Sequence, residues 1–396
     1  MSSQPLDGID VVTLGQLYNG PYCSLMLSYL GANVVKVEPP DGEPLRSRVD
    51  TGEPPELVML NSNKKGITLD LKSASGKELF RDLAEKADVL VENYSVGTMD
   101  RLGLGYDDLK EHNEELIYAH GSGYGESGPY QGYPAMDLTI QAISGVMDVT
   151  GFPDGPPMKA GIAVGDFMGG IHLFAGILAA LFQREQTGEG QFVEVSMHDT
   201  MFPTLASALG AYFDEKDVPP RTGNRHSGLA QSPYNVYETS DGYVALFGVT
   251  DRHWQALLEE IGREDLVDDP RFESNVKRSK NADEVDRIIG DWMAEKDRDA
   301  AVSVLRDAGV PCGPVKEISE VVHDPHLEQR EMINWIDHPS YGEIAVPGLP
   351  IRLGESELPT IEPSPEQGQH TEEVLKQRLG LTEDEISVLR EEGVIQ

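Results

Sequence analysis

The sequence contains few basic residues. Lysine and arginine account for 32 of its 396 residues, against 68 aspartate and glutamate residues, which gives a formal net charge of −36 at pH 7. Such a charge repels nucleic acid and anionic lipid, so we expect neither nucleic acid nor a membrane as a partner. The acidic residues are scattered along the chain, and this pattern favours a halophilic protein from a salt-rich cytoplasm, where screening confines repulsion to roughly 3 Å. An ordinary acidic enzyme is the alternative.

Cysteines and long hydrophobic runs are also scarce. Cys23 and Cys312 do not make a disulfide framework, which favours a cytoplasmic protein. The first ten residues lack the basic and apolar regions of a signal peptide. The longest uncharged apolar run, 167–182, has 16 residues and falls short of the ~20 that span a bilayer, so we predict a buried helix. No metal site is expected, because the histidines are not spaced as ligands (His120, His172, His198 and His226).

The first part of the chain alternates short apolar strands with helices. We predict strands at 9–15, 33–40, 64–71, 88–94 and 116–125, and helices at 20–32 and 73–87. This rhythm indicates an α/β fold with a parallel sheet and helices on its faces. Helical character then dominates from Asp137 to about Leu181, and 190–209 is predicted as a strand running into a helix.

The composition of the sequence and the order of its predicted elements change near Pro219. Residues 219–228 have the composition of a linker, and 232–249 are typical of a hairpin with Ser240-Asp241-Gly242 at its turn. Helices are predicted at 251–262, 281–296 and 297–309, which indicates a smaller α+β domain ending near His326. The remaining tail has strand-like segments at 332–339 and 342–353 and a final polar helix at 382–393.

Asp166 is the most informative single residue. It stands between a strand-like run and the pair Gly169-Gly170, where a long apolar helix is predicted to begin. The positive end of the helix dipole is expected to keep its carboxylate ionised. Asp166 could be only an N-cap. Alternatively, Gly165, Gly169 and Gly170 let another molecule approach and offer N–H groups to an oxyanion, and the carboxylate then suits nucleophilic attack on an activated acyl group.

Three further segments could bind ligands. The glycine-rich segment 121–130 follows a strand and fits a ligand crevice, or it is a flexible loop. The turn containing Gly15 and Gly20 lacks the G-x-G-x-x-G spacing, which disfavours nicotinamide binding. The scarce basic residues are candidates for anion contacts unless they are only solvated (Lys64, Lys65, Lys72 and Arg101).

Over essentially its whole length the sequence resembles the family III CoA-transferases. The segments that carry the resemblance include PLDGIDVVTLGQLYNGPYCSLMLSYLGANVVKVE, LNSNKKGITLDLK, DVLVENYSVGTMDRLGLGYDDL, LIYAHGSGYGESGPY, MDLTIQAISGVMDVTGFPDGPP, AGIAVGDFMGGIHLFAGILAAL and TGEGQFVEVSMHD. The resemblance implies that Asp166 is the catalytic aspartate. It would attack the donor thioester, form an aspartyl–acyl anhydride, and exchange acids through an aspartyl–CoA thioester.

The resemblance also implies binding residues. Residues matching the CoA-binding positions are Leu69, Lys72, Asn93, Tyr94 and Arg101, while Tyr18 and Asn19 match positions near the thioester and Asp137 matches an acidic position lining the site. Pro39 stands where the family has a basic residue, so that phosphate contact is lost unless Arg46 or Arg48 replaces it. The CoA thioester is a substrate, and no permanently bound cofactor is expected.

The family fold implies an interlocked homodimer. A Rossmann-like large domain would comprise 1–200, completed by 327–396, with 201–224 as a linker and 225–326 as the small domain. The related α-methylacyl-CoA racemases place a histidine where Met136 stands, which disfavours racemase activity. A non-catalytic CoA-binding protein is a further alternative.

The exchanged acids are predicted only as a class. We expect succinyl-CoA as donor and a small dicarboxylate as acceptor, such as mesaconate, malate or citramalate. Aromatic and carnitine-like acids are the alternatives. A second carboxylate needs a cationic partner, for which Arg46, Arg48 and Arg225 are the candidates.

Overall fold

The computed structural model describes residues 4–50 and 52–396 and divides into two compact units. Unit 1 contains residues up to 141, 162–202 and 322–396, and unit 2 contains 142–161 and 203–321. Residues 142–161, which the family-based boundaries place in the large domain, group with unit 2. Residues 1–3 lie outside the described residues. They begin both the predicted large domain and the ten-residue segment in which no signal peptide is expected.

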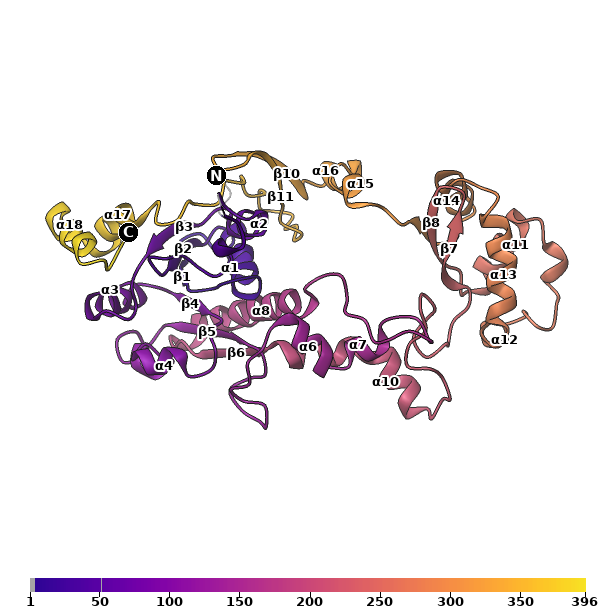
Figure 1. Ribbon diagram of the computed structural model, residues 1–396, viewed down its shortest axis with the longest axis horizontal. Helices are drawn as coiled ribbons and strands as arrows, with labels where there is room; N and C mark the ends of the chain where they lie inside the picture. The colour runs from indigo at the N-terminus through magenta and orange to yellow at the C-terminus, as the bar shows by residue number, and fades with distance from the viewer. Residues whose placement is uncertain (1–3, 51) are drawn as a thin grey trace. The chain divides into compact units, whose positions relative to one another are not determined.

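Unit 1 is built on a parallel sheet of six strands, ordered β3-β2-β1-β4-β5-β6 (Figure 1). The strands are β1 (Asp10–Thr13), β2 (Asn33–Glu38), β3 (Lys65–Thr68), β4 (Val89–Glu92), β5 (Ile117–Ser122) and β6 (Phe192–Ser196). This is the strand order of dinucleotide-binding folds, and it confirms the predicted Rossmann-like α/β sheet. Such sheets bind ligands at the carboxyl ends of the strands, where the order reverses between β1 and β4.

Helices cover both faces of the sheet because both faces are apolar. Val11 and Val12 of β1 point to opposite faces and belong to different buried clusters. One face packs on α1 (Asn19–Tyr29), α2 (Pro55–Asn61) and α8 (Val164–Thr187). The other packs on α3 (Ala74–Glu85), α4 (Thr98–Leu102), α5 (Tyr106–Lys110), α17 (Thr371–Val374), the π-helical turn Leu375–Leu379 and α18 (Glu383–Glu391).

Unit 1 also includes α6 (Asp137–Ile143, up to residue 141), α9 (Met197–Met201), α16 (Pro325–Gln329), the 3₁₀ turn Arg46–Arg48 and the hairpin β10 (Ile333–His338) and β11 (Gly342–Pro347). By length and composition alone, α8 could cross a membrane. However, Leu173, Phe174 and Ile177 of α8 lie in the core formed with α1 and the sheet. The run predicted as a buried helix is therefore the core helix of unit 1.

Two local predictions were wrong. Helical character was expected to dominate from Asp137 to about Leu181, but α6 and the short α7 (Val146–Val149) are followed by non-helical residues 150–163. Residues 158–163 form no strand before α8, and helix α2 was not anticipated. Glycine and proline are frequent between 151 and 161, and both break helices.

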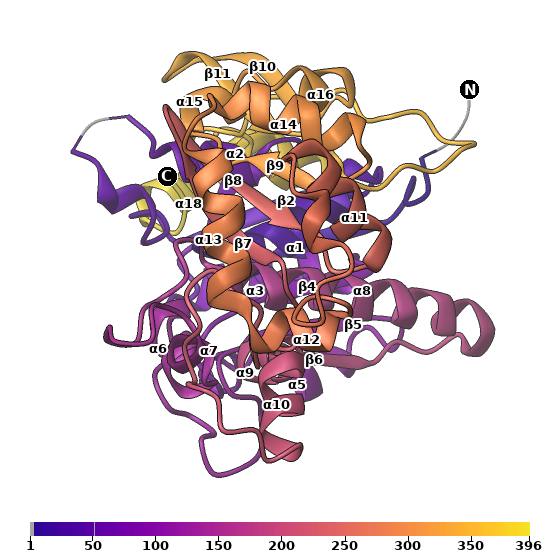
Figure 2. The same cartoon turned by 90° about the vertical axis from the view of Figure 1, so that its right-hand side faces the viewer.

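Unit 2 contains a three-stranded antiparallel sheet, β7-β8-β9. Its strands are β7 (Tyr234–Thr239), β8 (Gly242–Phe247) and β9 (Cys312–Pro314), and Thr239 pairs with Gly242 around the predicted turn. Helices α11 (Asp251–Glu260), α13 (Ala282–Met293) and α14 (Arg298–Asp307) enclose a separate core beside this sheet (Figure 2). The remaining elements are α10 (Ala206–Phe213), α12 (Asn275–Lys280), α15 (Ile318–Val321) and 3₁₀ turns at Phe202–Leu205 and Glu264–Leu266.

Candidate active site

A pocket opens at the carboxyl ends of β1, β4 and β5, the place that this sheet topology favours for ligands. Its volume of about 130 Å³ is small against the ~300–1,000 Å³ of pockets for drug-sized ligands. The loops after the three strands supply most of its lining, together with Asn19, Met136, Asp166 and Met197. The glycine-rich segment 121–130, predicted to fit a ligand crevice, contributes Gly121–Gly125. All of these residues belong to unit 1.

Asp166 is the third residue of α8, and the N-cap position is held by Ala163. Asp166 is therefore not the N-cap of this helix. Its carboxylate accepts no hydrogen bond from the part of the chain that the structure describes. Burial, together with the charge of Asp137 and against the opposing charge of Arg48, raises the pKa of the Asp166 carboxyl to about 7. With this pKa the Asp166 carboxyl is only partly ionised near neutral pH, because burial opposes the stabilisation expected from the helix dipole.

Asp137 supplies the cap that Asp166 does not. Its Oδ1 accepts hydrogen bonds from the backbone N–H groups of Gly165 (2.7 Å) and Asp166 (3.4 Å), while its Oδ2 accepts one from Gln141 Nε2 (2.6 Å). A carboxylate at this position satisfies otherwise unpaired donors of the first helical turn. Asp137 therefore fixes the start of α8 and places a second negative charge beside Asp166.

The three glycines near Asp166 serve close packing. Gly169 and Gly170 lie inside α8, where backbone N–H groups bond to carbonyls four residues earlier, and the N–H of Gly165 is taken by Asp137. A Cβ on Gly170 would stand 2.7 Å from the carbonyl oxygen of Asn19, and one on Gly169 would overlap the Asn19 side chain. The oxyanion role expected for these glycines does not fit this geometry, since their N–H groups already have acceptors.

Asn19 lies in the gap that these glycines leave. Its side chain is buried, its Nδ2 donates to the backbone carbonyl of Asp166 (3.4 Å), and its Oδ1 makes no hydrogen bond within the described residues. Asn19 also faces Gly121 at the end of β5, where a Cβ would overlap Oδ1. It thus joins the first loop, α8 and β5 beside the candidate nucleophile.

Tyr18 and Arg48 complete the surroundings of Asp166. The ring of Tyr18 lies 6.2 Å from that of Phe167, and Arg48 Nη1 donates to the Tyr18 hydroxyl at 2.9 Å. The side chain of Arg48 is about half exposed, and its only carboxylate partner among the described residues is Glu56 at 3.9 Å. Arg48 therefore keeps most of its hydrogen-bonding capacity for another group.

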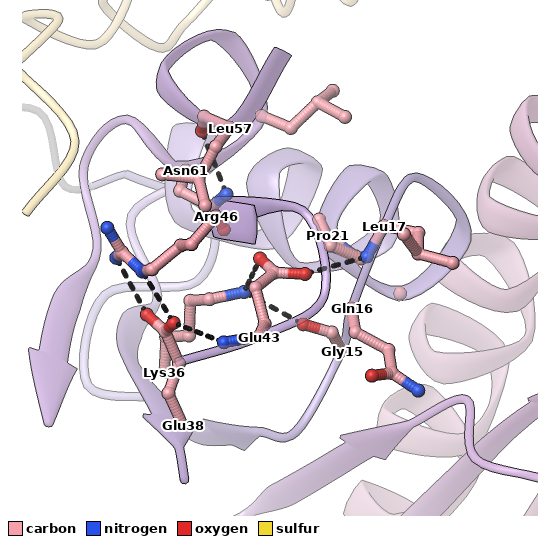
Figure 3. A network of polar contacts seen from close by, with 12 residues as sticks. Gly15, Gln16, Leu17, Pro21, Lys36, Glu38, Glu43, Arg46, Leu57 and Asn61 are labelled. Carbon is pink, nitrogen blue, oxygen red and sulfur yellow. Dashed lines mark hydrogen bonds and ion pairs between the residues drawn. The ribbon is translucent and has the colours of Figure 1, made fainter. Parts of the chain in front are cut away.

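A buried ionic network holds the loop that carries Tyr18 (Figure 3). Lys36 Nζ donates to Glu43 Oε1 (2.7 Å) and to the carbonyl of Gly15 (2.9 Å), and Glu43 Oε2 accepts from the N–H of Leu17 (2.8 Å). Leu17 has φ +60°, a conformation that costs energy for a branched residue. The network offsets this strain and fixes the loop at the mouth of the pocket.

Arg46 belongs to the same network. It binds both oxygens of Glu38 (2.7 and 2.8 Å) and is also paired with Glu53. Arg225, in unit 2, is paired with Asp283 and Asp286. Both guanidinium groups already have carboxylate partners, so Arg48 is the candidate for a second substrate carboxylate that remains available.

A second pocket of unit 1 adjoins the first and shares Gln16 and Tyr94 with it. Predicted residues Leu69, Lys72, Tyr94 and Arg101 line it, as does Pro39. Asn93 lines the first pocket, and its amide exchanges two hydrogen bonds with the backbone of Gln16 (2.8 and 3.0 Å). Most of the predicted residues thus gather around two connected pockets at one edge of the sheet.

Sequence reasoning missed some residues of this region. Gln16 lines both pockets, Glu92 and His120 contact the backbone of Tyr94, and Glu126 is paired with His120. His120 was considered only as a metal ligand. The available signal was a charged or polar residue at the end of an otherwise apolar strand, as in VLVE and LIYAH. No group of three or more potential metal ligands occurs in residues 4–50 and 52–396.

Comparison with known proteins decides the family. The family model described as CoA-transferase family III matches residues 6–371. This chain is a member of that family. It is 38% identical over 363 residues, 89% of this chain and 90% of the relative, to a succinyl-CoA:mesaconate CoA-transferase of Haloarcula hispanica. It is 36% identical over the full length of both chains to a formyl-CoA:oxalate CoA-transferase of Streptomyces coelicolor.

Solved structures agree with this assignment. A CaiB/BaiF family protein of Brucella suis superposes with a TM-score of 0.84 at 32% identity, covering 95% of this chain and all of that one. The predicted family is confirmed, and the chain is an enzyme of the CoA-transferase type. Acyl-CoA thioesters and carboxylic acids are accordingly its class of substrates.

Proposed function

We propose that this CoA-transferase moves CoA from succinyl-CoA to a small dicarboxylate, with mesaconate, malate and citramalate as the favoured acceptors. The observation that carries the proposal is the position of Asp166: its carboxylate lines a small pocket without a hydrogen-bond donor from the described protein. A carboxylate with a pKa near 7 is ionised at mildly alkaline pH and poorly solvated, which favours nucleophilic attack.

The chemistry assigned to Asp166 needs no metal and no separate base. A carboxylate oxygen attacks the thioester carbonyl, the C–S bond breaks, and CoA leaves as the thiolate from an aspartyl–succinyl anhydride. The thiolate attacks the aspartyl carbonyl, succinate leaves, and an aspartyl–CoA thioester remains. The acceptor carboxylate displaces the thiolate again, and thiolate attack on the acceptor acyl group restores Asp166. Every step exchanges a thiolate and a carboxylate at a carbonyl carbon.

The second pocket supports a place for the CoA moiety. Lys72 and Arg101 are cationic groups suited to phosphates, and Leu69 offers an apolar contact. Pro39 also lines this pocket and supplies no charge, and Arg46 is held by Glu38 and Glu53. We assign the phosphate contacts to Lys72 and Arg101, and the pantetheine chain to the passage beside Tyr94 and Gln16.

Arg48 supports the choice of dicarboxylates. It lies close enough to Asp166 for its charge to lower the pKa of that carboxyl. Its guanidinium group donates a hydrogen bond to the neutral Tyr18 hydroxyl. We assign the second carboxylate of the acid to Arg48. A charge-assisted hydrogen bond of this kind contributes about 1.5–3 kcal/mol, and relatives named for succinyl-CoA and mesaconate fit the same class.

A panel assay tests the function directly. The protein is incubated with succinyl-CoA and separate dicarboxylic, monocarboxylic and aromatic acids, and the CoA esters are read by mass spectrometry. We expect mesaconyl-, malyl- or citramalyl-CoA, and no transfer by Asp166→Asn. Transfer to monocarboxylates alone contradicts the dicarboxylate assignment. Deuterium entering the α-carbon of a 2-methylacyl-CoA would instead support a racemase.

Arg48→Gln separately tests the assignment of the second substrate carboxylate to Arg48. At a pH well above the pKa of Asp166, where the loss of the Arg48 charge leaves the nucleophile ionised, we expect the KM for dicarboxylates to rise about tenfold or more while monocarboxylate transfer keeps its rate. Arg287→Gln is the control, because Arg287 pairs with Glu284 and Asp291 of its own helix, α13, and lies in unit 2. An equal loss for both classes of acid would contradict the assignment.

The interlocked homodimer is the assembly that we propose from the family. Large apolar side chains remain exposed within each unit, including Phe182 in unit 1 and Tyr212 and Phe213 in unit 2. Light scattering after size exclusion should give twice the chain mass of 43.4 kDa. A monomer that retains full activity would contradict this proposal.

A further inference from the structure

The backbone of Tyr94 is held at both ends by side chains outside the proposed chemistry. Its N–H donates to Glu92 Oε2 at 2.7 Å, and its carbonyl oxygen lies 3.0 Å from His120 Nε2. Glu92 is the last residue of β4, and it is paired in register with His120 of the neighbouring strand β5. Because Tyr94 lines both pockets, these contacts fix the wall that the two pockets share.

His120 also reaches the next loop. Its Nδ1 forms an ion pair with Glu126 Oε1 at 2.6 Å, and Glu126 follows the glycine-rich residues that line the pocket of Asp166. On the other side of the ring, Nε2 lies 3.6 Å from Glu92 Oε1. His120 thus joins the loop after β4 to the loop after β5.

The neighbours of His120 favour a proton on each ring nitrogen. Nε2 faces a carbonyl oxygen, which only accepts, and Nδ1 faces a carboxylate. A neutral imidazole has one N–H and would turn a lone pair toward one of these oxygens. The geometry therefore selects the imidazolium form, even though the ring is almost completely buried.

The charges around the ring favour the same form. Burial lowers the pKa of His120, but the contact with Glu126 and the charge of Glu92 outweigh it and raise this pKa to about 9. Burial raises the pKa of Glu92 to about 7, against the lowering effects of His120, Tyr94 N–H and the Tyr118 hydroxyl. The third strand beside this cluster, β6, contributes the uncharged ring of Phe192 at 6.5 Å and the carboxylate of Glu194, which is paired in register with His120 and accepts a hydrogen bond from the backbone N–H of Glu126.

We propose that His120 is a positioning residue that, as an imidazolium paired with Glu126, holds Tyr94 in place for the thioester substrate and sets the alkaline limit of activity. This inference rests on the proposed function in placing substrate beside Tyr94. Loss of the His120 proton leaves one of its two acceptors without a donor, so the two loops separate and substrate binding weakens. Chemistry at Asp166 is not changed directly, and the effect should appear mainly in KM.

The pH dependence of kcat/KM for acyl-CoA tests this role. Glu126→Gln keeps an acceptor and removes the charge, so the pKa of His120 falls, and we expect the alkaline limb to move down by about one pH unit. Asp107→Asn is the matched control, because Asp107 lines the same cavity as Glu92 and Glu126 without contacting His120. An alkaline limb at the same pH in Glu126→Gln and wild type overturns the proposal.

His120→Gln separates charge from hydrogen bonding. Glutamine can donate to the Tyr94 carbonyl but cannot pair as a cation with Glu126. We expect a higher KM for acyl-CoA, a smaller change in kcat, and no alkaline limb near pH 9 in a variant with unchanged circular dichroism. A purely structural residue would lower activity equally at all pH values, and that result would contradict the proposal.

A direct titration remains informative if the transferase reaction itself fails. The protein has ten histidines, and the ¹³C-labelled ring signal missing from His120→Gln identifies His120. We expect this signal to titrate near pH 9 in the catalytically inactive Asp166→Asn protein and at lower pH when Glu126→Gln is added. A neutral His120 ring at pH 7.5 overturns the inference, whatever the enzyme proves to transfer.

Discussion

The carboxylate of Asp137 accepts a hydrogen bond from the backbone N–H of Asp166. The side chain of Asp137 therefore caps α8, and Asp166 is the third residue of that helix. This relationship explains why the candidate nucleophile is buried at a helix start yet is not stabilised as an anion. The capping donors are used by Asp137, and its charge acts against ionisation of Asp166.

Asp137→Asn should lower the pH at which the enzyme becomes active. An asparagine Oδ1 still accepts from the N–H of Gly165, whereas the negative charge that raises the pKa of Asp166 is gone. The pKa of Asp166 then falls below about 7, and the acidic limb of the kcat profile moves to lower pH. Steady-state rates between pH 5 and 8 measure the shift, and an acidic limb that moves upward would contradict this electrostatic role.

Asp166→Asn should increase stability while removing activity. A carboxyl whose pKa is raised in the folded state binds its proton more tightly there than in the unfolded chain. The protonated Asp166 carboxyl therefore stabilises the folded wild-type protein at low pH. This contribution to the free energy of unfolding is lost as the pH rises from the pKa of an ordinary aspartate through about 7. The gain in Tm of the variant should be larger at pH 8 than at pH 5. Equal gains at both pH values would mean that the carboxyl is not perturbed in this way.

Two glycines in helices distinguish close packing from helix propensity. Gly170→Ala should destabilise the protein by about 1–3 kcal/mol, as overpacking does, because the new Cβ meets the Asn19 carbonyl oxygen at 2.7 Å. Gly290→Ala in α13 meets no atom within 4 Å and should stabilise by up to about 1 kcal/mol. Urea unfolding of both variants measures the difference, and a stabilised Gly170→Ala would show that α1 and α8 are not closely packed.

Salt dependence tests the expectation drawn from the charge. With a net charge of −36, self-repulsion opposes the folded state in dilute buffer. The Tm should rise with KCl as the Debye length falls from about 10 Å at 0.1 M to about 3 Å at 1 M. A Tm and activity that are already maximal in dilute buffer would contradict a salt-rich cytoplasm and favour an ordinary acidic enzyme.

Local patterns in the sequence were sufficient for the sheet of unit 1 and the hairpin of unit 2. The valine-rich strands of β1, β2 and β4 are apolar on both faces, which only a sheet covered on both sides explains. Asp166 was recognised because a charge beside glycines at the start of an apolar helix is conspicuous. Its N-cap alternative was wrong because the cap comes from Asp137, 29 residues away in sequence, and local patterns do not contain such a partner.

Other features of the site depend on tertiary contacts that a single sequence does not carry. Burial of Asp166 by the surrounding loops raises its pKa against the effect expected from the helix dipole. The candidates Arg46, Arg48 and Arg225 could be separated only when Glu38, Glu53, Asp283 and Asp286 were seen beside two of them. The placement of Glu92 beside His120 likewise required the register of β4 and β5.

Mass spectrometry of the protein during turnover tests the central claim most directly. Trypsin cleavage after Lys159 and Arg184 would isolate peptide 160–184, which contains Asp166 as its only acidic residue. With succinyl-CoA present and hydroxylamine added, we predict a hydroxamate on Asp166 in the wild-type protein and none in Asp166→Asn. An active wild-type enzyme whose peptide 160–184 never carries an acyl, CoA or hydroxamate group would contradict covalent catalysis by Asp166.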